Sequence, residues 1–117
     1  MPYLSELLDR KVKDSADIVI GRLRDILISP QVFEYSPLEY LVVERQKDKE
    51  NILIPYSFVG NFSPRGVVLK TPLSKIPISL ETEDNNWVYL KRDVLDEQIV
   101  DVEGARVVRV NDLRLNI

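Results

Sequence analysis

An internal repeat constrains the fold of this chain more than any other feature of its sequence. Residues 7–28 align without a gap on residues 94–115, an offset of 87 residues. Five of the 22 aligned pairs are identical and six more keep an aliphatic residue, whereas ordinary composition would give about one or two identities. The identical pairs are Leu8/Leu95, Asp9/Asp96, Asp14/Asp101, Arg22/Arg109 and Asp25/Asp112. The alternative is a generic pattern shared by two β-hairpins; the number of identities favours duplication.

Each copy of the repeat predicts a β-hairpin preceded by one helical turn. The turn spans residues 5–9 (92–96 in the second copy), and a short strand follows that ends near Lys13 or Val100. A tight turn is expected at 14–17 and 101–104, because an Asp at the first position can accept bonds from N–H groups ahead of it. Gly104 supplies a positive φ, and Asp17, which occupies the same place, tolerates that region better than most residues.

The long second strand of each hairpin, 18–28 and 105–115, changes the parity of its apolar residues part-way along. A period-2 pattern that slips by one residue predicts a β-bulge. Asp25 and Asp112 lie at the slip, where a carboxylate can accept bonds from unpaired N–H groups. A metal-binding or acid–base role is the alternative; we interpret both aspartates as structural.

The region between the copies predicts short strands separated by turns. Six of the seven prolines fall between residues 30 and 77, and we expect strands at 40–44, 52–57 and 67–70. The alternating charges of residues 44–50 indicate an exposed hairpin tip. The resulting prediction is a mostly β protein: a small antiparallel β-barrel, residues 1–88, followed by the first hairpin of a second, incomplete repeat, residues 89–117. No long helix is expected.

The incomplete second repeat predicts association with other polypeptide. Either the chain is the N-terminal part of a longer protein, or its second hairpin fills a gap in a partner's sheet. Open strand edges tend to pair with another chain, and we therefore expect protein partners or further domains of the same polypeptide, and a homodimer.

Composition excludes several classes of function. The chain has no His and no Cys, which excludes imidazole catalysis, thiol chemistry and zinc sites built from these residues. Its net charge is −3 and it has no Lys/Arg-rich run, so nucleic-acid binding is not expected. Its apolar runs are shorter than the ~18 residues of a membrane span, and residues 1–6 do not resemble a secretory signal. A cytoplasmic location is the prediction.

The remaining candidate residues are more typical of structural roles than of a site. Two groups of acids could supply oxygen ligands to Mg²⁺, but turn and surface roles explain them better. Arg22 and Arg109 are expected to pair with carboxylates on neighbouring strands. Four aromatic residues are expected in the core or at its rim. We therefore predict no catalytic residue, no metal ligand, no cofactor and no enzymatic activity. The acids are Asp9, Asp14 and Asp17, and Glu81, Glu83 and Asp84; the aromatic residues are Tyr56, Phe58, Trp87 and Tyr89.

Residues 5–12, 14 and 20–26 resemble the opening of a PRC-barrel domain, whose typical pattern is L-x-G-x-x-V-x-D-x-x-G-x-x-V-G-x-V-x-D. Residues 51–59 are similar to a later strand of that family. Asp9 and Asp17 depart from the pattern, because glycine is common at both places. Residues 90–113 resemble tandem PRC-barrel units that precede an MgtE-type intracellular domain and CBS domains in magnesium-transporter-like bacterial proteins.

The resemblance implies a six-stranded barrel with a regulatory or adaptor role on the cytosolic side of a membrane-associated protein, without membrane insertion by this segment. PRC barrels also occur in ribosome maturation factors, so an RNA or ribosome-maturation accessory module is the alternative. Fold alone does not decide between them.

Overall fold

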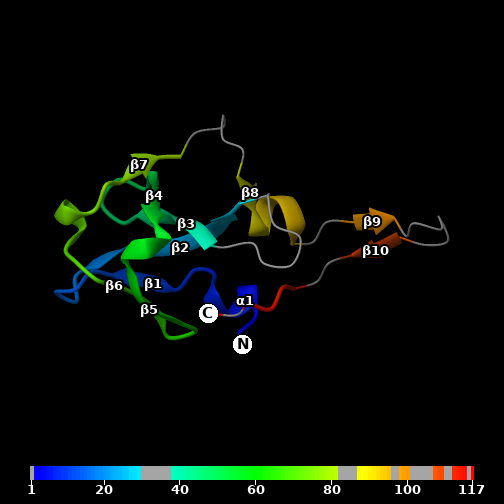
Figure 1. Ribbon diagram of the computed structural model, residues 1–117, viewed down its shortest axis with the longest axis horizontal. Coiled ribbons are helices and arrows are strands. Elements are labelled where there is room, and N and C mark those ends of the chain that lie inside the picture. Colours follow the sequence, from blue (N-terminus) through cyan, green and yellow to red (C-terminus); the bar gives the residue numbers. More distant parts are fainter. Residues whose placement is uncertain are drawn as a thin grey trace.

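The computed structural model describes residues 2–29, 38–81, 87–95, 98–100, 107–109, 112–115 and 117. Most of its elements are short strands (Figure 1). In chain order they are α1 (Leu4–Leu7), β1 (Lys11–Lys13), β2 (Val19–Ile28), β3 (Leu38–Arg45), β4 (Asn51–Pro55), η1 (Tyr56–Phe58), β5 (Val59–Ser63), β6 (Gly66–Leu69), η2 (Leu73–Lys75), β7 (Ser79–Leu80), β8 (Val88–Tyr89), η3 (Leu90–Val94), β9 (Gln98–Val100) and β10 (Val107–Arg109).

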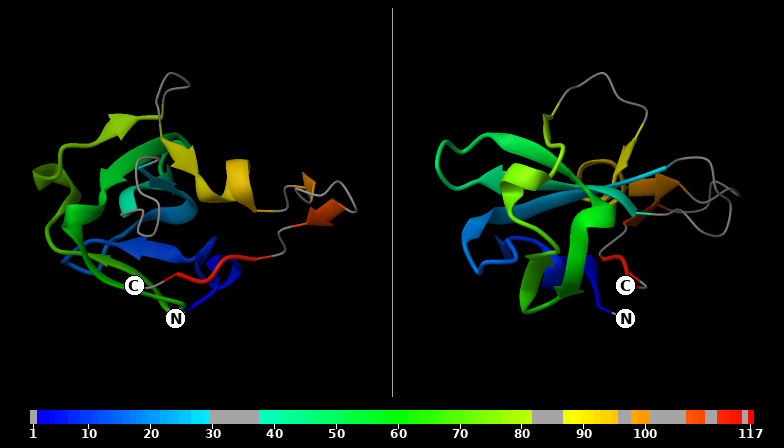
Figure 2. Two further views of the ribbon diagram at one scale, coloured as in Figure 1. Left: turned by 45° about the vertical axis from the view of Figure 1, so that its right-hand side comes forward. Right: turned by 60° about the vertical axis from the view of Figure 1, so that its left-hand side comes forward.

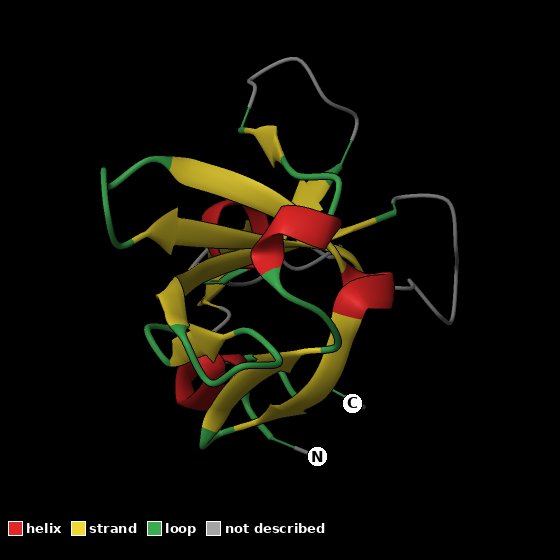
Figure 3. Ribbon diagram, turned by 90° about the vertical axis from the view of Figure 1, so that its left-hand side faces the viewer, coloured by secondary structure: helices red, strands yellow, loops and turns green. Residues whose placement is uncertain are grey.

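The main sheet is open and mixed, with the strand order β5-β6-β1-β2-β3-β4-β7, and β8 pairs with the end of β2. The predicted mostly β class is therefore confirmed. The expectation that every strand pair is antiparallel is wrong at one place, because β1 and β6 run parallel. After β4 the chain crosses to the opposite side of the sheet, where the β5–β6 hairpin adds to the free edge of β1. Figure 3 shows the strong curvature of this sheet.

The curved sheet encloses the main apolar core. Leu23 and Ile26 of β2, Leu41 of β3 and Ile54 of β4 are fully buried there together with Leu4 of α1. A second, smaller cluster covers the opposite face of the same strands. It contains Leu27, Val42, Leu53 and Tyr89, with Tyr40 and Trp87 packed against it. The central strands are thus buried on both faces near β8, which pairs with the end of β2.

The β-bulge predicted in the second strand is confirmed in β2. Leu23 pairs with Val43 and Asp25 pairs with Val42, so one residue, Arg24, has no partner across the strand pair. The extra residue moves Ile26 onto the same face as Leu23, and both reach the main core. The parity slip in the sequence therefore has its physical cause in this bulge.

The turn chemistry of the first hairpin also agrees with the sequence. Asp17 adopts φ 66° and Asp9 adopts φ 64°, a region that favours glycine. Both positions are those at which the PRC-barrel pattern has glycine and this chain has aspartate. The second hairpin's turn, 101–104, lies outside the described residues.

The second copy forms its own two-stranded sheet, β9–β10, which stands apart from the main sheet in Figure 1. Its pairs Gln98↔Arg109 and Ile99↔Val108 repeat, at an offset of 87, the pairs Lys11↔Arg22 and Val12↔Gly21 of β1–β2. The two copies therefore share strand register at these two pairs. They differ at the third, where Lys13 pairs with Val19 whereas Val100 pairs with Val107, the equivalent of Ile20.

Two further expectations concern helices and membranes. The single helical turn expected near residues 5–9 is present as α1, and its counterpart is the one-turn η3. Within the described parts of the chain, no helix is both long and apolar enough to cross a lipid bilayer.

Candidate functional site

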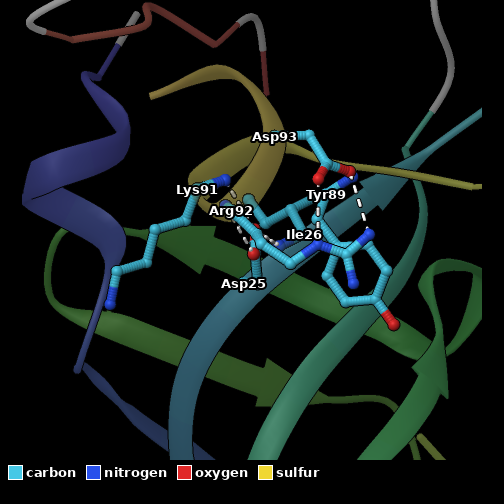
Figure 4. A network of polar contacts seen from close by, with 6 residues as sticks. All are labelled: Asp25, Ile26, Tyr89, Lys91, Arg92 and Asp93. Atoms are coloured by element: carbon cyan, nitrogen blue, oxygen red, sulfur yellow. Dashed lines mark hydrogen bonds and ion pairs between the residues drawn. The ribbon is translucent and has the colours of Figure 1, made fainter. Parts of the chain in front are cut away.

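A network of polar contacts is centred on Asp25, in the bulge of β2. Its side chain is buried, with the residue only 6% exposed. The carboxylate accepts hydrogen bonds from the backbone N–H groups of Lys91 (2.7 Å), Arg92 (3.1 Å) and Ile26 (2.8 Å) (Figure 4). Asp25 thus holds the turn η3 against the end of β2.

Burial raises the pKa of the Asp25 carboxyl above its ordinary value, and the bonds from the three backbone N–H groups oppose that rise. Desolvation favours the neutral acid, whereas the N–H donors favour the carboxylate.

Strand pairing extends the contact beyond Asp25. Leu27 pairs with Tyr89 and Ile28 pairs with Val88, so that β8 continues the sheet at the end of β2. Asp93 fixes the start of η3 by accepting a bond from Tyr89 N–H at 2.9 Å. Figure 4 shows Asp93 and the Arg92 side chain beside the Tyr89 ring; the guanidinium carbon lies 3.7 Å from the ring centroid. The same guanidinium pairs with Asp93, so Arg92 contacts both the Tyr89 ring and the acid that binds Tyr89 N–H.

An equivalent contact joins the chain's first residues to its last ones. Asp112 accepts hydrogen bonds from Ser5 N–H (3.2 Å), from the Ser5 hydroxyl and from Leu113 N–H (2.8 Å). The Ser5 hydroxyl lowers the pKa of the Asp112 carboxyl, and the N–H groups of Leu113 and Ser5 act in the same direction. Asp112 thus holds α1 as Asp25 holds η3.

Backbone pairing of the kind found in strands also joins the residues around Ser5 to those around Asp112. Tyr3 and Arg114 form an isolated antiparallel bridge, and Leu115 N–H donates to Pro2 O at 2.8 Å. Glu6 accepts a bond from Tyr3 N–H at 3.0 Å. The Arg114 guanidinium lies 4.8 Å from the centroid of the Tyr3 ring.

These two contacts are copies of one arrangement. Asp25 binds Arg92 N–H and Asp112 binds Ser5 N–H; both the two aspartates and the two donors are related by the 87-residue offset. The bridge between Leu27 and Tyr89 corresponds to the bridge between Arg114 and Tyr3. Leu27 and Arg114 are again 87 residues apart, but the two tyrosines are 86 residues apart. The wider π-type turn η3 accommodates this difference of one residue. The opening turn of each repeat therefore sits on the second strand of the other.

We call this two-part contact the repeat interface: residues 2–6 on 112–115, and residues 88–93 on 25–28. Apolar side chains support it from inside, since Leu4 is fully buried and Leu90 is 5% exposed. Leu113 and Leu115 pack against the same core. The interface is the candidate functional site because it combines buried charge, directed N–H donors and apolar burial.

No protein family, curated protein or solved structure matches the chain. The site is therefore interpreted from its own geometry, which shows a carboxylate in each half binding the backbone of a docked turn.

Asp9, Asp14 and Asp17, which were considered as Mg²⁺ ligands, each have another partner; Asp9 contacts Arg24. Asp14, which is 5% exposed, accepts bonds from Ala16 N–H (2.8 Å) and Ile18 N–H (3.0 Å) within its own turn. Asp17 pairs with Lys13. In the described part of the chain, no three acids are grouped so that they could hold a metal ion. Glu81 accepts a bond from Asn51; the other two members of its group, Glu83 and Asp84, lie outside the described residues.

Arg22 was expected to pair with a carboxylate on a neighbouring strand, and this prediction is wrong. Arg22 donates to the backbone carbonyl of Asp9 at 2.9 Å, not to a carboxylate. The cross-strand ion pair belongs instead to the bulge residue Arg24, which binds Glu44 of β3 at 2.6 Å and also contacts the Asp9 carboxylate. The bulge turns Arg24 toward both acids, and sequence reasoning did not single it out. The side chain of Arg109 lies outside the described residues.

The aromatic residues take core and rim positions, as predicted. Tyr89 is buried, and Trp87 contacts Tyr40 edge-on with ring centroids 5.6 Å apart. Tyr56 and Phe58 are half-buried and pack against the main core.

One further sequence signal of the repeat interface is a pair of acids. Glu6 and Asp93 are acids at the same position of the two repeats, each three or four residues after the N–H group that it binds. An acid at that place is typical of a helix start, and its recurrence marks both docked turns.

Proposed function

We propose that this chain is a non-enzymatic interaction module of the PRC-barrel type, which serves as a regulatory adaptor in a magnesium-transporter-like protein. The observation that carries the proposal is the unequal completion of the two repeats. The β1–β2 hairpin has β6 on one side and β3 on the other. The β9–β10 hairpin repeats two of its strand pairs, but among the described strands it pairs with nothing else.

Unpaired strand edges bind other strands through backbone hydrogen bonds. The first repeat indicates which strands would fit. A strand parallel to β9 would occupy the place that β6 has on β1, and a strand antiparallel to β10 would occupy the place that β3 has on β2. The proposed activity is therefore strand addition at the β9–β10 hairpin, by a protein partner or by another domain of the same polypeptide.

The magnesium-transporter part of the proposal is supported by the resemblance of residues 90–113. Such a module would act on the cytosolic side of the membrane. The alternative, an RNA or ribosome-maturation accessory module, is favoured less because the net charge is −3 and nucleic-acid binding requires positive charge facing the phosphates.

Strand addition can be tested with a peptide probe of residues 38–46, which contains β3. We expect the peptide to slow amide hydrogen exchange at those residues of β10 (Val107–Arg109) whose N–H groups point away from β9. The matched control is the same peptide with Val43→Pro, which removes a backbone donor and disfavours the extended pairing. Equal exchange with both peptides would contradict strand addition.

The transporter assignment needs a separate probe. We expect a purified MgtE-type intracellular domain with its CBS domains to bind the full chain in calorimetric titration. Absence of binding, together with tight and salt-sensitive binding of a structured RNA, would replace this proposal by the RNA alternative.

A further inference from the structure

The repeat interface is self-complementary, and this property identifies a partner. Each chain carries both kinds of surface twice: an opening turn, and a second strand with an aspartate that receives such a turn. We infer that a second copy of this chain can supply the second repeat, so that two chains exchange residues 88–115 and form a closed dimer. This inference rests on the proposed interaction role and names the partner.

Exchange would preserve the contacts that hold the second repeat. The Asp25 carboxylate would receive Lys91 and Arg92 N–H from the partner chain instead of its own. The β2–β8 pairing would likewise form between chains. Because the local contacts are identical in both states, the monomer and the dimer differ mainly in the entropy of association. The dimer should therefore increase with protein concentration.

The buried contacts of this segment favour a second copy as the occupant. Tyr89 is 3% exposed and packs with Val42 and Leu53 in the smaller core. A different protein would have to supply an equivalent ring, turn and N–H donors at the same spacing. A second copy already carries all of them, and two-fold exchange leaves no unpaired half of the interface.

Geometry allows the exchange to be trapped by disulfides, because the chain has no cysteine of its own. Ile28 and Val88 are direct cross-strand partners, and the Cα separation of such a pair, about 4.5–5.5 Å, suits a disulfide. We would mix a size-tagged Ile28→Cys chain with an untagged Val88→Cys chain, unfold them together, refold at high concentration and oxidise.

The expected result is a disulfide that joins the tagged chain to the untagged one. Its yield should exceed, by about tenfold, that of a control mixture of Ser15→Cys and Ser74→Cys chains, because docking raises the effective concentration of the two thiols. Ser15 and Ser74 are exposed, so the control reports random collisions. A double Ile28→Cys/Val88→Cys chain, refolded dilute, verifies the geometry by closing an internal disulfide.

The inference is refuted if the double variant closes internally while the mixed pair links no more often than the control. The pair Tyr3→Cys and Arg114→Cys, on the other half of the interface, repeats the test should the first pair fail to fold. If neither double variant closes internally, the repeat interface itself is refuted. None of these results depends on the β9–β10 edges, so the exchange test and the peptide test can fail independently.

Discussion

Replacing Asp25 by alanine should release the second repeat from the main sheet. Asp25→Ala removes the acceptor of three backbone N–H groups at 2.7–3.1 Å. A buried donor left without a partner costs about 1–3 kcal/mol. Lys91 and Arg92 are exposed residues, so their N–H groups can bind water once η3 separates from β2. The three penalties therefore do not simply add. We expect a loss of about 3 kcal/mol in the free energy of unfolding.

Urea unfolding followed by tryptophan fluorescence provides the assay. Trp87 is the single tryptophan and lies edge-on to Tyr40 beside β8, so it reports both docking of the second repeat and global unfolding. With an m-value of about 1.5 kcal/mol/M, the expected loss lowers the urea midpoint by about 2 M. Asp25→Asn retains one acceptor oxygen and should lower the midpoint by roughly half as much.

Asp48→Ala is the matched control. Asp48 is an exposed acid whose contacts, to Arg45 and Glu50, lie within the charged tip, and its removal should barely move the midpoint. If Asp25→Ala shifts the midpoint no more than Asp48→Ala does, the carboxylate does not hold η3 and our account of the repeat interface fails.

Three further predictions concern pH, steric space and backbone conformation. Folding lowers the pKa of Asp112, so Asp112 stabilises the fold above its unfolded-state pKa, and this stabilisation is lost as pH falls through its folded-state pKa. Folding raises the pKa of Asp25, so the effect has the opposite sign. The free energy of unfolding should fall as pH rises through the folded-state pKa of Asp25. Acid unfolding curves of Asp112→Asn and Asp25→Asn should therefore deviate from the parent in opposite directions. Gly21→Ala should lower the free energy of unfolding in urea by about 3 kcal/mol, because the new Cβ would lie 2.0 Å from Glu44 O. In Gly60→Ala the nearest atom to the new Cβ is 3.2 Å away, so the loss should be clearly smaller. Equal losses in the two variants would contradict the close approach at Gly21. Asp17→Gly should raise the melting temperature slightly, since Asp17 adopts φ 66° and glycine does so without strain; a lower melting temperature would show that the Lys13–Asp17 pair outweighs the strain.

Local features of the fold could be predicted from the sequence because their causes are local. The bulge at Asp25 follows from the parity of neighbouring apolar residues, and the conformation of Asp17 follows from its place in a four-residue turn. The repeat extended this reasoning to a second hairpin, β9–β10, which has two of its three strand pairs in common with the first.

Strands with weak local signals could not be predicted. β5 contains Gly60 and Asn61, both poor strand formers, and β7 and β8 have only two residues each. Their pairings depend on distant segments, and the parallel β1–β6 pair depends on the path that the chain takes across the sheet. These choices are made by tertiary contacts, which periodicity does not report.

The candidate site was predicted only in half. Backbone N–H donors to the two aspartates were predicted, and each aspartate does bind the N–H group of the residue after it. The donors from the docked turns, however, lie 66 to 107 residues away in sequence. A carboxylate at a bulge indicates that N–H groups are near; it does not indicate whose they are. Only the recurrence of Glu6 and Asp93 could have connected the aspartates with the opening turns.

The meeting of the chain's two ends has a consequence for synthesis on the ribosome. Leu4 N–H donates to Leu113 O and Leu115 N–H donates to Pro2 O, so the two ends lie side by side (Figure 2). At 5–20 residues per second, α1 emerges roughly 5–20 s before its partner strand has been made. During that time Leu4, buried in the finished fold, is exposed. α1 is therefore made before the segment that binds it and can find its place only after that segment has been translated.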